Sequence, residues 1–328
     1  MKKKVAISVI IPCFNGANYL VQLIKSLSAV DFPDFEIIIV DDGSTDESVK
    51  KIKNLKSTPN RRAGKIKNLI LIENKKNQGA AKSRNIGAKK ANGKYLLFLD
   101  VDTKVHSQCL SAIFQKFEKN PQIGAIQAKL DTGGHFLTPF GFPYEIPAGK
   151  KEKLIFGART AGMAIRKDLF EKIKGFDEDY FIYGEDTDLS WRVWLAGKKV
   201  LYLPQAKVYH FGKSSLTKKT SERIFYEGVK NNLSNLLKNS SLTLLLFILP
   251  LYLFTCLIIS FKQLLIGNSL GFLRIYQGIF WNFTNIKKIL KKRKEINLYR
   301  QFIPLKIIFG NLDFLTYLKR GTKWLVNI

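Results

Sequence analysis

The chain has 328 residues, of which 46% are hydrophobic, so it can bury the core of one large domain or of two smaller ones. Its 54 Lys and Arg against 26 Asp and Glu give a formal net charge of +28, which predicts an anionic partner: nucleic acid, an anionic membrane surface or a phosphorylated substrate. The three cysteines are widely scattered and show neither a disulfide framework nor the spacing of a zinc site, which suits a reducing cytosol.

The first hundred residues alternate between strand-like and helix-like patterns. Short apolar runs rich in β-branched residues predict strands at residues 5–11, 36–40, 69–73 and 95–99. Helical spacing separates them, including a helix within residues 77–93. This alternation is typical of βαβ units, so we expect a mainly parallel sheet with helices on both faces. In such sheets, ligands bind beyond the carboxyl ends of the strands.

Polar residues gather where the predicted strands end. They are Asn15, Asp41, Asp42, Asp100 and Asp102. Because strand side chains alternate between faces, Asp100 and Asp102 are expected to project the same way. Adjacent carboxylates repel unless a cation or a proton lies between them. A solvated turn is the alternative, but the shared sheet edge favours a ligand site.

Four segments resemble the motif series of the family 2 glycosyltransferases, which have a GT-A fold. They are SVIIPCFNGANYL, EIIIVDDGSTDES, NQGAAKSRNIGAKKANGKYLLFLDVDT and GFDEDYFIYGEDTDLSWR. Each is weak alone, and together they are most similar to the rhamnosyltransferase-like members. The resemblance implies a Rossmann-like GT-A catalytic domain over residues 1–217, with a nucleotide-binding half of about 1–103 and an acceptor half of about 104–217.

The resemblance also implies a nucleotide-sugar donor and a divalent cation, Mg²⁺ or Mn²⁺, both of which prefer oxygen ligands. Asp102 would contact the metal directly, Asp100 would lie nearer the ribose or donor sugar, and His210 would reach the metal or have a structural role. The implied donor-nucleotide residues are Pro12, Phe14, Asn15, Asp41, Asp42, Arg84 and Asp100. Two alternatives stay open: Asp42 holds its own turn, and Arg84 is merely solvated.

On the acceptor side, the resemblance implies Asp186 as the base that takes the proton of the acceptor hydroxyl. Glu185 would contact donor or acceptor. Both acids are also expected at a helix N-terminus, where capping is the alternative role. Three residues complete the predicted support: Trp191, which packs or lines the acceptor groove, Arg192, which pairs with the acidic loop, and Lys213, which touches phosphate.

Two further expectations concern the acceptor and the mode of transfer. Residues 132–147 are rich in Gly, Pro and aromatic side chains, which predicts a long loop over the site for acceptor recognition. The sequence contains no Q-x-x-R-W element of the kind found in the processive synthases of the family. We therefore expect the transfer of one sugar, with the inversion that the resemblance implies.

The composition changes from residue 205 onward, where 20 Lys and Arg against 4 Asp and Glu leave a net charge of +16. Residues 221–238 predict an amphipathic helix. Residues 242–261 are uncharged and long enough to span a bilayer, although Pro250 is expected to break that segment into halves.

A second segment, residues 264–283, is predicted to return as a hairpin or a shallow re-entrant insertion, in spite of Arg274 at its centre. The basic cluster at residues 287–294 would then face anionic lipid on the cytoplasmic leaflet. We therefore expect residues 218–328 to form a helical, basic, membrane-associated region that holds the catalytic domain at the cytoplasmic face of the cell membrane.

The expected function is the transfer of one sugar from a UDP-, dTDP- or GDP-linked donor to a glycan or lipid-linked acceptor, in surface polysaccharide or glycolipid synthesis. One alternative is a nucleotidyltransferase that uses the same carboxylates and releases pyrophosphate. Another is a basic protein that binds nucleic acid or membrane without catalysis. We expect no nucleic-acid partner, because the excess charge clusters around the apolar segments and no nucleic-acid module is recognisable.

Overall fold

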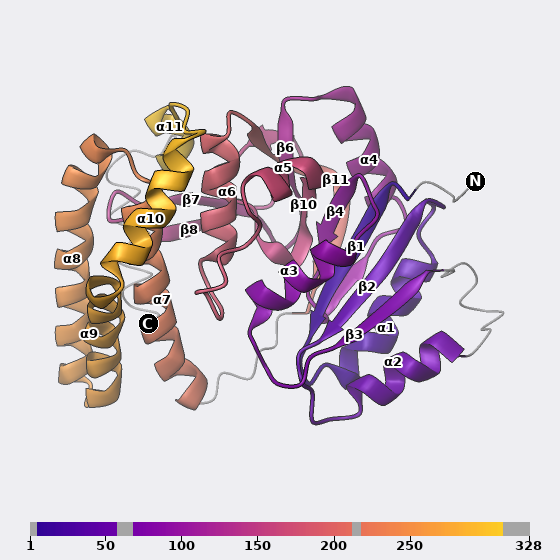
Figure 1. Ribbon diagram of the computed structural model, residues 1–328, viewed down its shortest axis with the longest axis horizontal. Coiled ribbons are helices and arrows are strands. Elements are labelled where there is room, and N and C mark those ends of the chain that lie inside the picture. The colour runs from indigo at the N-terminus through magenta and orange to yellow at the C-terminus, as the bar shows by residue number, and fades with distance from the viewer. Residues whose placement is uncertain (1–4, 58–67, 212–217, 311–328) are drawn as a thin grey trace.

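The computed structural model describes residues 5–57, 68–211 and 218–310. Across these residues the strands build a nine-stranded mixed sheet in the order β3-β2-β1-β4-β10-β6-β11-β5, with β9 paired to β11 (Figure 1). A hairpin of β7 and β8 forms a second sheet. The strands of the large sheet are β1 Ile7–Cys13, β2 Phe35–Asp41, β3 Leu69–Glu73, β4 Tyr95–Phe98, β5 Thr103–Val105, β6 Ile123–Lys129, β9 Lys153–Leu154, β10 Met163–Arg166 and β11 Lys199–His210.

Helices cover both faces of the sheet because its central strands are apolar on both sides. Ile7 and Val9 of β1 point into one core, whereas Ile10 points into the other. The first core is covered by α1 Ala17–Ser28, α2 Ser48–Ser57 and α4 Cys109–Lys119. The opposite core is covered by α3 Ala80–Lys90, α5 Lys167–Lys172 and α6 Glu185–Leu195. The predicted α/β architecture is confirmed.

The sheet changes direction at its centre. The four strands β3, β2, β1 and β4 are mutually parallel, so their carboxyl ends meet at one edge, with Cys13 of β1 level with Asp41 of β2. β10 then runs antiparallel between β4 and β6. The prediction of a mainly parallel sheet therefore holds for the nucleotide-side strands and gives way to a mixed pattern beyond them.

The prediction of a long loop at residues 132–147 is wrong, because β7 Thr132–Leu137 and β8 Pro143–Pro147 form a β-hairpin there. Gly134 has a φ of +94° beside a register shift, and two of the three prolines, Pro143 and Pro147, stand at the ends of β8. The Gly and Pro residues thus mark a bulge and strand ends. Phe136 stacks on Tyr144 across the pair, with ring centroids 6.1 Å apart.

The C-terminal part consists of helices that lie at one end of the molecule (Figure 1). They are α7 Lys218–Asn239, α8 Leu242–Leu265, α9 Ser269–Thr284, α10 Ile286–Asn297 and α11 Leu305–Phe309. By length and composition, α8 could cross a membrane, and it is the one helix among the described residues that meets this test. It continues through Pro250, so the predicted break there is wrong: a proline removes one helical hydrogen bond without ending this helix.

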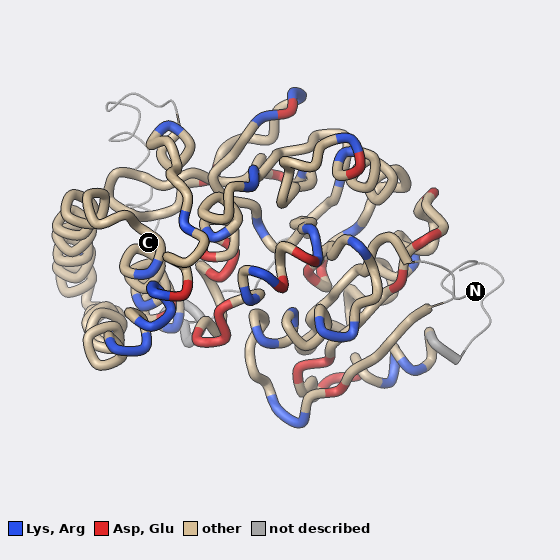
Figure 2. Tube along the Cα trace, turned by 45° about the horizontal axis from the view of Figure 1, so that its top comes forward, with Lys and Arg blue, Asp and Glu red and all other residues tan. Residues whose placement is uncertain are grey.

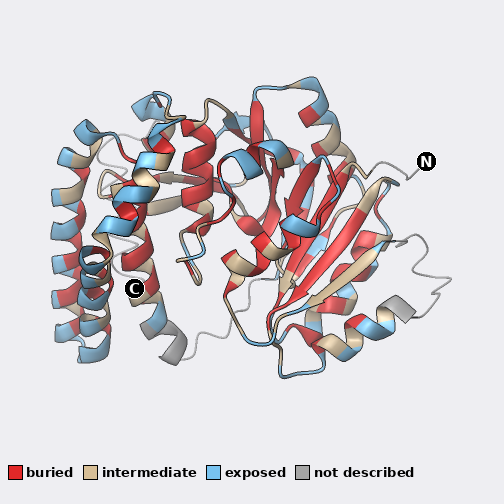
Figure 3. Cartoon of the chain, in the orientation of Figure 1, coloured by how far each residue is buried: buried red, intermediate tan, exposed pale blue. Residues whose placement is uncertain are grey.

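The helices α8 and α9 form a hairpin whose turn includes Gly267, with a φ of +73°. The predicted return segment at 264–283 therefore begins inside α8, and α9 itself spans 16 residues. α8 buries one stripe, which includes Tyr252 and Cys256, and leaves its outer side to solvent (Figure 3). Lys and Arg positions are concentrated along α10 and sparse on α8 (Figure 2).

The hydrophobic core is continuous between the sheet and the C-terminal helices. Leu189 of α6 and Phe142 of the hairpin belong to the same buried cluster as Leu236 of α7 and Tyr252 of α8. Phe142 stacks on Tyr252 with ring centroids 4.7 Å apart. The helical region is therefore packed directly against the elements that carry the candidate site.

Candidate active site

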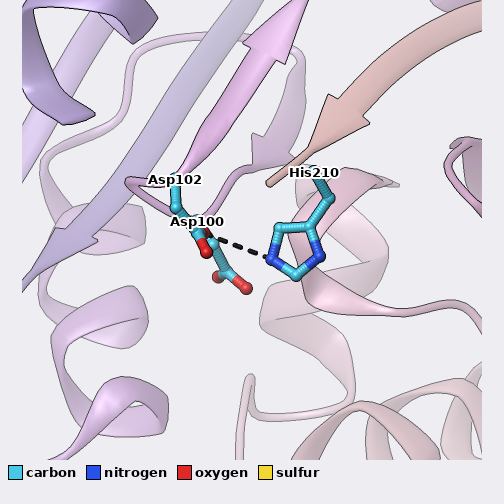
Figure 4. A group of neighbouring side chains, drawn as sticks. All are labelled: Asp100, Asp102 and His210. Carbon is cyan, nitrogen blue, oxygen red and sulfur yellow. Dashed lines mark ion pairs between the residues drawn. The ribbon is translucent and has the colours of Figure 1, made fainter. Parts of the chain in front are cut away.

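Asp100, Asp102 and His210 come together beyond the carboxyl end of β4 (Figure 4). One potential ligand atom from each residue lies within 4.8 Å of the others. His210 Nε2 lies 3.2 Å from Asp102 Oδ1. Strand alternation is not the cause, because β4 ends at Phe98 and the two acids lie in the turn that follows. His210 reaches them from the end of β11, where it pairs with Thr103 of β5.

This cluster has the donor set of a divalent-cation site: two carboxylates and an imidazole, none of them fully buried. The hydrogen bond and charge of Asp102 raise the pKa of His210 above its ordinary value. The residues present therefore fit the cation that the sequence predicts. All three residues are partly exposed, so their side chains are accessible to the phosphate groups of a nucleotide.

Arg84 joins this cluster to the acidic turn of α6. Its guanidinium is buried, with Nη2 2.7 Å from Asp100 Oδ1 and Nη1 2.9 Å from Glu185 Oε1. Burial opposes the charge of Arg84, but the two carboxylates outweigh it and raise the pKa. The solvated alternative for Arg84 is therefore wrong, because the residue is an internal bridge between two predicted site residues.

Glu185 and Asp186 open α6, as predicted, directly after Tyr183 and Gly184, which have φ values of +67° and +77°. The second carboxylate oxygen of Glu185, Oε2, is buried without a hydrogen-bond partner among the described residues. Burial and then the neighbouring Asp186 raise the pKa of Glu185 to about 7, against the effect of Arg84. A buried carboxylate oxygen without a hydrogen-bond partner is rare in proteins, and a bound ligand is one group that can supply the missing hydrogen bond.

Asp186 is half-buried and is held by the residue that follows it. Its Oδ1 accepts a hydrogen bond of 2.7 Å from the backbone N–H of Thr187. Thr187 Oγ1 in turn lies 3.0 Å from His135 Nε2 on β7, and burial lowers the pKa of His135. A Cβ at Gly157 would lie 2.0 Å from that same Nε2, so glycine is required there for His135 to occupy this position.

The two acids at the nucleotide end of the site, Asp41 and Asp42, differ in whether both of their carboxylate oxygens have hydrogen-bond partners. Asp41 is buried, and its Oδ2 accepts from Ser44 N while its Oδ1 has no partner among the described residues. Asp42 accepts from Gly79 N at 2.9 Å and from the Asn74 amide at 2.8 Å. Asp42 thus has a structural role, but it holds the segment between β3 and α3 and not its own turn, whereas Asp41 has an oxygen available for a ligand.

The remaining predicted donor residues line the end of β1. Phe14 is 48% exposed, and Pro12 lies level with Val40 of the neighbouring strand. Asn15 has a φ of +53° and accepts a hydrogen bond from Thr45 N through its Oδ1. Asn15 therefore joins the two turns that follow β1 and β2.

The three residues predicted to support the acceptor side have different outcomes. Trp191 is buried and packs edge-on against Phe156, which favours packing over a groove-lining role. Arg192 forms an ion pair with Asp188 at 2.6 Å, as predicted for the acidic segment. Lys213 lies outside the described residues.

Sequence reasoning missed Arg159, a single basic residue in the small-residue segment before β10. Its Nη1 lies 3.0 Å from Glu145 Oε1 of β8, and its positive charge adds to the effect of burial that lowers the pKa of His135 and partly offsets the rise in the pKa of His210. Its charge is therefore felt both at His210 of the cation cluster and at His135 beside Thr187. The isolated cation within GARTAG was the available signal.

A family model described as "Glycosyl transferase family 2" matches residues 8–174, slightly more than half of the chain. The chain therefore belongs to this family. A second model, "N-terminal domain of galactosyltransferase", matches residues 155–214 and includes the acidic turn.

Curated relatives agree with this assignment. An uncharacterized glycosyltransferase of Haemophilus influenzae is 33% identical over 53% of this chain and 59% of its own length. The GalNAc(5)-diNAcBac-PP-undecaprenol beta-1,3-glucosyltransferase of Campylobacter jejuni is 31% identical over 67% of this chain and 69% of its own length. The chain spans about half the length of the first curated relatives that it matches.

Solved structures show the GT-A fold. The mannosyltransferase PcManGT from Pyrobaculum calidifontis, in complex with GDP-Man and Mn²⁺, superposes with a TM-score of 0.56 at 14% identity. The superposition covers 93% of this chain and 88% of that one. It therefore includes the C-terminal helices as well as the sheet.

Proposed function

We propose that this protein is a glycosyltransferase that moves one sugar from a nucleotide-diphosphate sugar to a hydroxyl of a glycan or lipid-linked acceptor. The Arg84 bridge carries the proposal. It joins Asp100, one of the potential cation ligands, to Glu185, beside the proposed base, so donor and acceptor chemistry share one centre. A nucleotidyltransferase would use the first cluster and would have no need of the second.

On the donor side, we assign Asp41, Phe14, Pro12 and Asn15 to the nucleoside and Asp100 to the ribose or the sugar. Asp41 Oδ1, which has no hydrogen-bond partner among the described residues, supports this, since a ribose or base donor would satisfy it. Asp102 and His210, with Asp100, would hold Mg²⁺ or Mn²⁺. When bound, the cation neutralises charge that develops on the diphosphate leaving group. A UDP-, dTDP- or GDP-linked donor fits this chemistry.

On the acceptor side, we assign Asp186 as the general base. The acceptor oxygen forms a bond to the anomeric carbon while the bond from that carbon to the diphosphate oxygen breaks. The hydroxyl proton passes to the Asp186 carboxylate, and the nucleoside diphosphate departs. Glu185, fixed by Arg84, contacts donor or acceptor through its free Oε2. One displacement of this kind inverts the anomeric centre.

We further propose that residues 1–217 form the catalytic unit and that residues 218–328 bind the cytoplasmic face of the cell membrane. We also propose that the protein acts in surface polysaccharide or glycolipid synthesis, as a rhamnosyltransferase-like member of the family. The outer side of α8 and α9 is an exposed apolar surface, and α10 beside it is strongly basic (Figures 2 and 3). The apolar surface includes Leu246, Phe247, Phe254, Phe261, Leu273, Phe280 and Phe283. Apolar insertion combined with attraction to anionic lipid suits such a surface. The undecaprenol-linked substrate named for the Campylobacter relative supports a lipid-linked acceptor.

A donor panel tests the catalytic proposal. UDP-, dTDP- and GDP-sugars are assayed with and without Mn²⁺ for thermal shift and for release of nucleoside diphosphate. Asp186→Asn should lower turnover by about 10²- to 10⁴-fold while the donor-induced thermal shift is retained. Asp168→Asn is a matched control, because its Oδ1 also accepts from the next backbone N–H, at 2.8 Å. Release of pyrophosphate would instead establish a nucleotidyltransferase, and full activity of Asp186→Asn would remove that residue from the mechanism.

Liposome flotation tests the membrane proposal. We expect the full chain to float with vesicles that contain anionic lipid and to show weaker binding to neutral vesicles. Phe254→Asp, in the middle of the exposed surface of α8, should reduce flotation. A salt-sensitive gel shift with DNA or RNA, together with an absence of flotation, would contradict the proposal and favour a nucleic-acid partner.

A further inference from the structure

Two asparagines of α7 bind the backbone of the turn that leads into the acidic motif. Asn231 Nδ2 donates to the carbonyl oxygens of Ile182, at 2.9 Å, and Tyr183, at 2.7 Å. Asn235 Nδ2 donates to the carbonyl oxygen of Gly184 at 3.0 Å. Three consecutive carbonyls directly before Glu185 are therefore bound from the C-terminal region.

The turn has a backbone that needs such support. Tyr183 has a φ of +67°, a conformation that costs a residue with a side chain about 1 kcal/mol or more. Such conformations persist when their surroundings fix them. Asn231 and Asn235 are four residues apart on one helix, so a single rigid face of α7 supplies both amides.

Lysines fix the same face of α7 to the acids on either side of the turn. Lys238 Nζ contacts Asp177, which precedes the turn, and lies 3.0 Å from Asp188 Oδ1, which follows it. Lys230 Nζ donates to the carbonyl oxygen of Asp179 at 3.0 Å. The segment on both sides of the Tyr183–Gly184 turn is therefore docked on α7.

We propose that Asn231 and Asn235 are positioning residues, which hold this turn so that Glu185 meets Arg84 and Asp186 faces the acceptor. The inference rests on the proposed function of Asp186. It adds that α7, which lies outside the residues matched by either family model, builds part of the active site. Both asparagines are buried and their Nδ2 groups donate to backbone carbonyls, so we assign them to the turn and not to the reacting atoms, although Asn231 Oδ1 has no partner among the described residues.

The same helical region offers a matched control. Asn282 of α9 is also buried, and its Nδ2 donates to the carbonyl oxygen of Lys230 at 2.9 Å. It ties α9 to α7 without contact to the turn. Asn282→Ala should therefore lower thermal stability much as Asn231→Ala does, but without altering catalysis. Asn235→Asp keeps an acceptor for the Tyr180 hydroxyl and removes the amide donor to Gly184.

The experiment measures kcat and donor KM of the full chain for Asn231→Ala, Asn235→Ala, Asn235→Asp and Asn282→Ala, together with their melting temperatures. We expect the first three to lose about 10- to 100-fold in kcat, with donor KM changed by less than about threefold, because a small misplacement of a catalytic group costs rate rather than donor binding. Asn282→Ala should retain wild-type kcat. If kcat instead follows melting temperature across all four variants, or if Asn235→Asp turns over normally, the positioning role is wrong.

Amide hydrogen exchange separates this inference from the proposed function. The backbone amides of residues 185–188 should exchange faster in Asn231→Ala and Asn235→Asp than in Asn282→Ala or the wild type. If the wild type transfers no sugar from any donor, the proposed function fails, and exchange still tests the support of the turn. Equal exchange in all variants would overturn the inference, even in an active enzyme.

Discussion

Two groups of acidic side chains in this protein differ in the origin of their counter-charge. Asp100 and Asp102 are partly exposed and have His210 and one guanidinium beside them. Asp177 and Asp188 are almost completely buried, and lysines from the C-terminal helices contact both. The first group fits a cation from solution, whereas the second already has its cations in the fold.

The difference appears in how the surroundings affect ionisation. Burial opposes the charge of Asp188, but Arg192 and Lys238 lower its pKa overall. The same holds for Asp177, whose pKa Lys238 and Lys292 lower strongly. Acids neutralised in this way are structural, even though they lie within or beside a motif that predicts catalysis. Proximity of carboxylates in sequence therefore does not by itself identify a functional site.

The largest effect is expected when a counter-charge is removed from the buried acids Asp177 and Asp188. Lys238→Met should lower the free energy of unfolding by about 3 kcal/mol, the lower end for a broken buried pair, because Asp177 and Asp188 keep their other cationic partners. Chemical denaturation measures this. Lys288→Met is the control, since Lys288 pairs with Asp179 while 52% exposed and should contribute less than about 1 kcal/mol. A loss below about 1 kcal/mol for Lys238→Met would contradict the structural role of this cluster.

The second prediction concerns the open group. Asp102→Asn should lower turnover by at least about 100-fold and abolish Mn²⁺-dependent thermal stabilisation. The free energy of unfolding without metal should change by less than about 1 kcal/mol, because the residue is partly exposed. Glu152→Gln serves as the control, since it removes a similarly exposed carboxylate paired with Lys116 at 2.7 Å. Retained Mn²⁺ stabilisation in Asp102→Asn would place the cation elsewhere.

Per pH unit, the smallest effect is that of the titration of Glu185, which Arg84 joins to Asp100. Because its pKa is raised from 4.5 to about 7, the folded state keeps a proton that the unfolded chain has released between these values. Its contribution to stability therefore falls as pH rises through this window, by up to about 1.4 kcal/mol per pH unit. The free energy of unfolding of Glu185→Gln, relative to wild type, should rise from pH 4.5 to pH 7. A constant difference would show that Glu185 titrates normally.

The sequence predicted the nucleotide half of the fold well, because runs such as EIIIV and YLLFL are apolar on both faces and alternate with helices. It also placed Asp100 with Asp102, although for a different reason than the observed turn. It did not predict the β7–β8 hairpin, because Gly134 and the prolines have positions in a bulge and at strand ends that composition alone does not distinguish from a loop.

Sequence patterns are weaker guides wherever function depends on contacts between distant segments. Arg84 was ambiguous until its two carboxylate partners, 16 and 101 residues away, were placed. The polar stripe of Asn231, Asn235 and Lys238 has regular helical spacing and resembles a solvated face. Only its burial against the Tyr183–Gly184 turn reveals its contacts.

The docking of α7 on that turn has a consequence for the minimal catalytic unit. A polypeptide trimmed to the recognisable motifs would retain every predicted acid, yet its acidic turn would lose the amides that bind it. Motif content therefore underestimates the length of chain that activity requires. Transplanting the motifs onto another scaffold would demand a replacement for this helix as well.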